Sequence, residues 1–197
     1  RGLGDGYKRQ SKNAIINQGV NKDKDSNWIN RIDFGKIESF KNEGFYGFVS
    51  VKSLLNNYSQ IPAIRGVYMV LRIITKEPFF LDKGSGGYFK GTDPNVAIKI
   101  LQEKWVYNTP VLYIGKAGGE GKEATLRSRI LQYLKFGQGK PVGHKGGCYI
   151  WQLSDAEELL FCWKPLPTDE PEDVESMLIS EFKHQYAGKR PFANLNK

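Results

Sequence analysis

Cysteine is scarce in this sequence, and neither of its two cysteines belongs to a metal-binding or disulfide pattern. Cys148 and Cys162 are 14 residues apart, without closely paired spacing, and each lies in an apolar stretch. A zinc site needs closely spaced pairs of ligands, and small secreted domains carry several cysteines. We therefore expect two buried thiols, and a disulfide only if the two stretches pair as strands.

Long apolar runs are also absent. No segment reaches the roughly 18 consecutive apolar residues from which a membrane-spanning helix is recognised. The sequence shows no secretory signal pattern either. These features predict that the protein has no membrane partner and is cytoplasmic.

Acidic residues are fewer than basic ones. The chain has 21 Asp and Glu against 29 Lys and Arg, which gives a formal net charge of +8 at pH 7. Such an excess favours a polyanionic partner, such as nucleic acid. A basic surface also serves solubility alone, so charge by itself does not identify a function.

The N-terminal quarter differs in composition from the rest. Residues 1–45 are rich in Gly, Asn, Lys and Asp and contain few aliphatic side chains. We predict a basic, partly flexible N-terminal arm. It lies along DNA phosphates, or it is a flexible tail, or it forms one small packed patch around Trp28, Ile29 and Phe34. Residues 46–197 have the composition of one packed domain.

The remaining sequence predicts helices and strands in mixed order. Apolar periodicity and capping residues indicate helices over 50–58, 93–105, 123–136 and 168–186. Apolar runs rich in β-branched and aromatic residues indicate strands over 66–74, 111–116, 147–153 and 159–164, the last two forming a hairpin. The fold class expected is α+β, with a small, mostly antiparallel sheet flanked by helices.

The last predicted helix carries a carboxylate on its apolar side. Val174, Leu178 and Phe182 form one stripe, and Glu175 falls beside them. A buried carboxylate is costly unless it is protonated, paired with a cation or bound to a metal. Glu175 is therefore a candidate metal ligand or the acidic partner of a buried ion pair.

The preceding helix places a cation and a phenol together. Arg129 and Tyr133 are four residues apart, so they share a helix face, and that face borders the apolar stripe. This arrangement suits the wall of a cleft. Alternatively, Arg129 covers the edge of the core with its alkyl stem.

Two tyrosines lie close to glycines within predicted strands. Tyr68 ends the run Gly66-Val67-Tyr68, and Tyr113 begins the run Tyr113-Ile114-Gly115. A strand glycine leaves space for a ligand or another backbone to approach. Lys116 follows at the strand end, where its ammonium group reaches the same region. Either tyrosine alone would be an ordinary strand aromatic.

A glycine-rich basic stretch follows the helix of Arg129. Residues 139–147 include Lys140, His144 and Lys145. The stretch suits a phosphate-contacting loop, and it suits equally well a tight connection to the next strand. His184 is predicted to project outward from the last helix as a surface histidine.

Taken together, these residues resemble the GIY-YIG endonuclease superfamily over residues 62–197. Gly66-Val67-Tyr68 resembles the first motif and Tyr113-Ile114-Gly115-Lys116 the second. The helix around Arg129 is similar to the one that carries the family's catalytic arginine, and Tyr133 falls where relatives have Tyr or His. Glu175 resembles the metal-binding glutamate, and Asn194 in Pro191-Phe192-Ala193-Asn194 resembles the closing asparagine.

The chain departs from the family pattern at two intervals. Tyr68 and Tyr113 are 45 residues apart, which is more than in compact members, so residues 75–110 are predicted to be an insertion. The interval from Glu175 to Asn194 is also long, and Asn196 remains an alternative to Asn194.

The resemblance implies a metal-dependent DNA endonuclease that hydrolyses phosphodiester bonds by a one-metal mechanism. Glu175 would hold one Mg²⁺ or Mn²⁺ ion per site, and Arg129 would neutralise the phosphoryl oxygens. Tyr68 would orient or deprotonate the water, and Tyr113 would share that network. A free tyrosine has a pKa of about 10, so base action needs a nearby cation, for which we expect Lys116.

The remaining motif residues receive supporting roles. Tyr133 would contact the scissile phosphate or support the water, and Asn194 would hold a loop or a phosphate by its amide. The predicted DNA contacts are Lys116, Arg127, Lys140, His144 and Lys145.

Two other functions remain open from the sequence. One is a catalytically inactive nucleic-acid-binding module built on the same fold, and the other is a structural domain whose tyrosine pair is coincidental. For the nuclease the expected partner is DNA. Cutting both strands would require a homodimer or sequential nicking.

Overall fold

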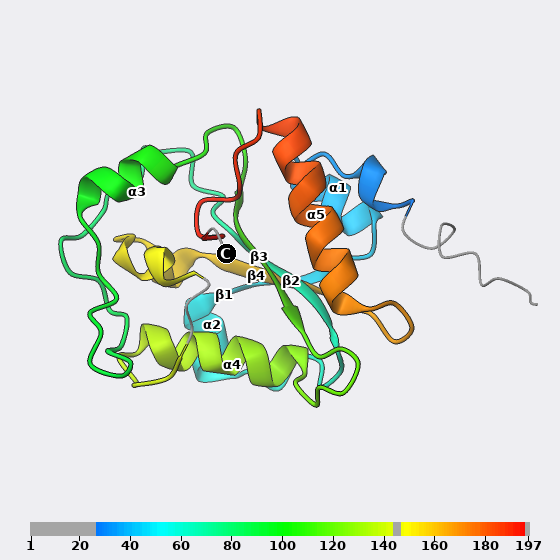
Figure 1. The fold of residues 1–197 in the computed structure, drawn as a ribbon, viewed down its shortest axis with the longest axis horizontal. Helices are drawn as coiled ribbons and strands as arrows, with labels where there is room; N and C mark the ends of the chain where they lie inside the picture. The colour runs from blue at the N-terminus through cyan, green and yellow to red at the C-terminus, as the bar shows by residue number, and fades with distance from the viewer. Residues whose placement is uncertain (1–26, 144–146, 196–197) are drawn as a thin grey trace, which may run out of the picture.

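The computed structural model describes residues 27–143 and 147–195 and has the predicted α+β architecture (Figure 1). Its sheet is antiparallel and has the strand order β1-β4-β2-β3. The strands are β1 (Tyr46–Ser50), β2 (Gly66–Leu71), β3 (Val111–Ala117) and β4 (Leu160–Pro165). The α-helices are α1 (Ile37–Asn42), α2 (Val51–Asn56), α3 (Ile98–Lys104), α4 (Leu126–Gly137) and α5 (Pro171–Gln185).

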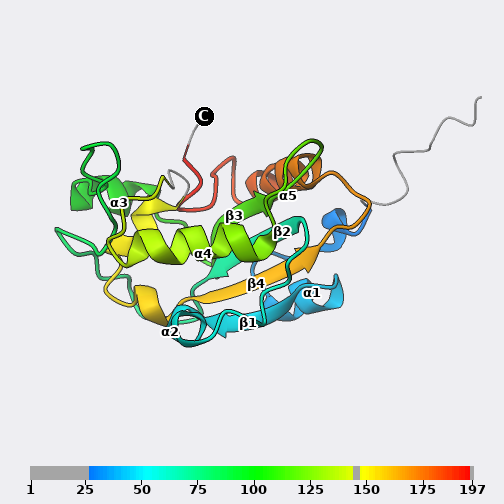
Figure 2. The ribbon, with the colours of Figure 1, turned by 90° about the horizontal axis from the view of Figure 1, so that it is seen from below.

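Figure 2 shows the strands following one another from β3 to β1, so that β3 lies at an edge. Strand β2 pairs on both sides, and all its residues are buried because helices cover both sheet faces. Its side chains alternate between the two faces. Val67 and Met69 face one core cluster, and Tyr68 and Val70 face the other.

Helices α4 and α5 cover opposite faces of the sheet near its β3 edge. Leu126 and Ile130 of α4 pack in the cluster that contains Tyr68, whereas Val174 and Leu178 of α5 pack in the cluster that contains Val67. Figure 1 shows the two helices on either side of β3. Side chains from both helices can therefore meet around this edge strand.

The N-terminal prediction is corrected for its second half. Trp28, Ile29, Phe34 and Phe40 are buried beneath α5, and the rings of Phe34 and Phe182 have centroids 5.3 Å apart. Residues 28–45 therefore belong to the packed domain, as in the alternative of a patch around Trp28. Residues 1–26 lie outside the described part of the chain.

The strand predicted over residues 147–153 is wrong. Cys148–Gln152 forms a 3₁₀-helix, η2, after Gly147, whose φ of 85° turns the chain. Gln152 is buried, and its amide donates to the carbonyls of Leu81 and Val96. A short apolar run does not distinguish a strand from a buried helical turn. Because no hairpin forms with β4, Cys148 and Cys162 remain free thiols.

The predicted insertion, residues 75–110, is mostly irregular. Its helix begins at Ile98 rather than near Asp93, because residues just before it bond distant segments: Asn95 Oδ1 accepts from the Gly84 amide, and the Val96 amide donates to Gln152 Oε1. Another 3₁₀ turn, η3 (Ala156–Glu158), precedes β4, and η1 (Ile29–Arg31) is the first element of the described chain.

Within the described residues, no helix combines the length and apolar character needed to cross a membrane.

Candidate active site

The two motif tyrosines lie together on the face of the sheet that α4 covers. Tyr68 of β2 pairs with Gly115 of β3, and Tyr113 is two residues before that glycine. The two ring centroids are 6.0 Å apart. A Cβ atom on residue 115 would lie 2.5 Å from Cζ of Tyr68 and 2.7 Å from Cε1 of Tyr113. Gly115 is therefore required because it makes room for both phenols.

Tyr113 is the more accessible phenol of the pair. Its exposed fraction is 8%, compared with 1% for Tyr68, which stacks on Phe161 beneath the sheet surface. A hydrogen bond joins the two phenols. A water or phosphate at the edge of β3 would therefore meet Tyr113 first, with Tyr68 behind it.

Helix α4 supplies the guanidinium group at this edge. A capping box fixes its first turn: the Ser128 amide donates to Thr125 Oγ1, and the Thr125 amide donates to Ser128 Oγ. Arg129 follows directly and is half-buried, with Nη1 donating to Gln132 Oε1 at 2.9 Å. Its positive charge lowers the pKa of both Tyr68 and Tyr113.

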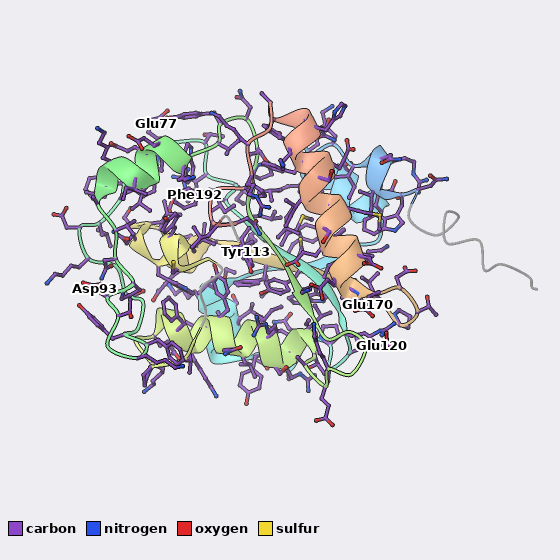
Figure 3. The ribbon with its side chains drawn as sticks, in the orientation of Figure 1. Glu77, Asp93, Tyr113, Glu120, Glu170 and Phe192 are labelled. Carbon is purple, nitrogen blue, oxygen red and sulfur yellow. The ribbon has the colours of Figure 1, made fainter. Side chains whose placement is uncertain are left out.

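Helix α5 places a carboxylate near the same phenols. The side chain of Glu175 is 15% exposed, and Oε2 lies 3.8 Å from Nζ of Lys116. Its negative charge raises the pKa of Tyr68 and of Tyr113. Figure 3 shows Tyr113 between α4 and α5. Arg129 and Glu175, which come from different helices, thus act on one pair of phenols around the edge strand.

Both phenols are protonated at neutral pH. An ordinary tyrosine is already protonated there, and burial moves both pKa values further from neutrality: it raises that of Tyr113 to about 12 and that of Tyr68 well above its usual value. The prediction that Lys116 lowers these pKa values is wrong: among the described residues, the cation that lowers them is Arg129. The phenols are suited to orienting a water by hydrogen bonds.

Lys116 is held by a carboxylate that the sequence did not single out. Its Nζ lies 2.8 Å from Oε1 of Glu172, whose other oxygen lies 3.3 Å from Nζ of Lys122. Hydrogen bonds to these two ammonium groups lower the pKa of Glu172 to about 2. The only signal in the sequence was the spacing of Glu172 and Glu175, one helical turn apart.

Tyr133 belongs to the core rather than to the cleft wall. It is fully buried, and its hydroxyl donates to the Gly147 carbonyl at 3.1 Å. Its ring packs against those of Trp151 and Phe161, with centroid separations of 5.5 and 5.4 Å. The predicted contact with the scissile phosphate is therefore excluded in this packing. What remains is a supporting role, because its ring centroid lies 5.9 Å from that of Tyr113.

Asn194 fixes the final segment to the edge strand. Its Oδ1 accepts from the Ile114 amide at 2.9 Å, and its Nδ2 donates to the Ile114 carbonyl at 2.8 Å. The Ala193 amide also donates to the Leu112 carbonyl. The sequence predicted that the Asn194 amide holds either a loop or a phosphate. In the structure it holds the final loop, because both of its amide atoms bond the Ile114 backbone. Asn196 lies outside the described residues.

The predicted DNA-contacting residues lie in different environments. Arg127 donates from Nε to the Ile61 carbonyl and from Nη2 to the Ser59 carbonyl, at 2.7 and 2.8 Å. Because these bonds tie α4 to the segment before β2, we remove Arg127 from the DNA-contacting set. Lys140 is exposed, and His144 and Lys145 lie outside the described residues. His184 is exposed on α5, as predicted.

The residues present fit a hard divalent cation with one protein ligand. Within the described ranges, no three His, Cys, Asp or Glu side chains gather into a metal-binding group. Glu175 provides an oxygen donor that is mostly buried but open to solvent. Mg²⁺ commonly keeps several waters and takes one or two carboxylates together with substrate phosphate.

Arg129, Glu175, Lys116 and the two phenols thus form a mixed acidic and basic site along one edge strand. A scan against protein-family models, a search of curated proteins and a search of solved structures each found no match to this chain.

Proposed function

We propose that this protein is a metal-dependent DNA endonuclease of the GIY-YIG type. One observation supports this proposal most strongly. Arg129 from α4 and Glu175 from α5 both act electrostatically on the paired phenols of Tyr68 and Tyr113, around the edge strand that carries the second tyrosine motif. These are the residue types that phosphodiester hydrolysis needs, and they come from four different elements.

The guanidinium group of Arg129 neutralises the phosphoryl oxygens as charge develops on them. Its planar fork matches two phosphate oxygens better than an ammonium group does. The half-buried position favours this role because electrostatic stabilisation is stronger where water is partly excluded.

Tyr113 orients the attacking water in this proposal. Its phenol is the more exposed of the two and stays protonated at neutral pH, since its pKa is raised to about 12. Tyr68 fixes the position of Tyr113 from behind through their hydrogen bond. The tyrosine assistance is therefore positioning, with both protons in place when the substrate arrives.

Glu175 is the residue that would hold Mg²⁺ or Mn²⁺. When bound, the ion supplies a water of lowered pKa and stabilises charge on the phosphate and the leaving oxygen. Lys116 lies between Glu175 and Glu172, at 3.8 and 2.8 Å. Its ammonium group is then available to pair with the phosphate once Glu172 releases it.

The test is a plasmid-cleavage assay with a matched pair of variants. Supercoiled plasmid is incubated with wild type, Glu175→Ala and Asp173→Ala, each with Mg²⁺, with Mn²⁺ and with chelator, and nicked and linear products are followed. Asp173 is an exposed carboxylate on the same helix. We expect metal-dependent cutting by wild type and by Asp173→Ala, and none by Glu175→Ala.

The other outcomes are equally informative. Cutting by Glu175→Ala at the wild-type rate would remove the proposed metal ligand. DNA binding without cutting by any protein would favour the catalytically inactive binding module. If none of the proteins binds or cuts DNA, the remaining interpretation is a structural domain.

A further inference from the structure

A second feature adjoins the candidate active site. A groove of about 570 Å³ lies between the C-terminal ends of α3 and α5, the turn η2 and the final segment of the described chain. The side chains that give it its character are Lys104, Tyr149, Lys183, Lys189, Arg190 and Asn194. None of its cations belongs to the tyrosine motifs or to the predicted DNA contacts.

The groove is strongly basic. Four cations line it, and the one carboxylate among the lining residues is Glu103, which lies 4.0 Å from Lys99. In the part of the chain that the structure describes, none of these four cations is in an ion pair. Unneutralised cations around a concave surface concentrate positive potential there and attract a polyanion.

The final segment connects the groove to the strand that carries Tyr113. Asn194 lines the groove, and its amide is bonded to the backbone of Ile114, the neighbour of Tyr113. Phe192 also lines the groove and packs against Tyr149 with centroids 5.9 Å apart. The groove therefore lies next to the edge strand of the tyrosine site, and a DNA chain that follows the final segment would reach it.

The size and lining of the groove favour a single strand over a duplex. Its volume is that of a site for a small organic molecule, so a duplex would lie across its rim, whereas an unpaired strand can enter it. Tyr149 is half-buried and presents part of its ring to the groove. Cations along a backbone track together with an aromatic ring for stacking are the features of single-strand binding sites.

We propose that this groove binds an unpaired single-stranded segment of the DNA substrate, next to the bond that is cut. The inference rests on the proposed nuclease function for its substrate, but it concerns binding alone. It assigns phosphate contacts to Lys183 and Lys189 and base stacking to Tyr149. It also implies that the preferred substrates carry an unpaired segment beside the cleaved bond.

The test measures binding without cleavage. Fluorescence anisotropy of a labelled oligothymidylate, and of a hairpin duplex with the same number of phosphates, is followed over a salt series in chelator. The variants are Lys183→Ala/Lys189→Ala, with Lys52→Ala/Lys76→Ala as the matched control. All four are exposed lysines, and the control pair lies outside the groove. A second pair is Tyr149→Ala and Tyr149→Phe.

We expect three results for the single strand. The groove double variant lowers the slope of log affinity against log salt by about 1.4, because each single-strand phosphate contact contributes about 0.7. Tyr149→Ala weakens binding roughly tenfold, and Tyr149→Phe keeps it because the ring is retained. The control double variant leaves the slope unchanged within error.

Two results would overturn the inference. One is single-strand binding by the groove variants that equals that of wild type. The other is tighter binding of the duplex than of the single strand, with the same loss in the groove variants, which would assign the groove to duplex DNA. Neither result depends on Glu175, so failure of this inference and failure of the proposed cleavage are distinguishable.

Discussion

At the scale of single residues, Arg127 and Arg129 of α4 have opposite roles although they are two positions apart. The guanidinium of Arg127 donates hydrogen bonds to the carbonyls of Ser59 and Ile61. The charge of the Arg129 guanidinium instead lowers the pKa of the phenols in the candidate site. The two arginines therefore form a natural matched pair, in which one substitution should affect stability and the other catalysis.

We expect Arg129→Ala to lower the cleavage rate by about 10² to 10³-fold, the usual loss for one donor that stabilises developing charge. Arg127→Ala should lower the melting temperature and leave the rate of the folded protein near that of wild type, since its guanidinium hydrogen-bonds to backbone. Thermal unfolding and single-turnover cleavage measure the two effects. An equal loss of rate in both variants would contradict this division.

Gly115 supports a second residue-scale prediction. A methyl group on residue 115 would come within 2.5 Å of Tyr68 and 2.7 Å of Tyr113, and both rings are enclosed by the core. We expect Gly115→Ala to reduce the free energy of unfolding by about 1 to 3 kcal/mol, as overpacking usually does. Urea unfolding measures it. A variant as stable as wild type would show that the phenols can separate at no cost.

At the scale of elements, α4 and α5 could be predicted because their local signals agree. Thr125 and Ser128 cap α4, Pro171 starts α5, and both helices carry a regular apolar stripe. The sequence predicts a strand where η2 lies, because its apolar residues are buried by tertiary packing, through contacts such as those of Gln152. Local sequence contains no information on such partners.

The same reasoning explains which site residues were found. Tyr68, Tyr113, Arg129 and Glu175 were recognised by motif and helical position, and the fold brings them together. The burial of Tyr133 and the pairing of Lys116 with Glu172 depend on segments distant in sequence, so they were missed. The sequence pattern thus predicted which residues lie together, and tertiary packing determined the contacts that each of them makes.

The ion pairs between β3 and α5 carry an element-scale prediction. Lys116 and Lys122 lower the pKa of Glu172 to about 2, so the folded state binds this proton less readily than the unfolded state does. Stability from this carboxylate is present above about pH 4.5 and is lost as the pH falls toward 2. We expect Glu172→Gln to melt below wild type at pH 7 and the difference to shrink in acid.

Melting temperatures of both proteins across this pH range would test the prediction. Glu181→Gln is a control, because Glu181 lies on the same helix and bonds only Gln185 within the described hydrogen bonds and ion pairs. A difference between wild type and Glu172→Gln that stays constant down to pH 2.5 would rule out the ion pairs as its source.

At the scale of the whole molecule, the core holds three phenols that resist ionisation. Tyr68, Tyr113 and Tyr133 are buried together, and burial raises the pKa of each above the usual value of 10. Below pH 10 these tyrosines are neutral in both the folded and the unfolded chain, so stability does not depend on them there. As the pH rises through 10, the unfolded chain loses these protons while the folded chain keeps them.

The free energy of unfolding should therefore fall between about pH 10 and pH 12, by up to about 1.4 kcal/mol per pH unit for each of the three phenols. Urea unfolding at pH 8, 10 and 11 measures the fall. Tyr68→Phe should reduce its slope by about one third, since that ring no longer titrates in either state, and Tyr58→Phe, at an exposed position, should not. Equal slopes in all three proteins would show that the buried phenols are not what limits stability in alkali.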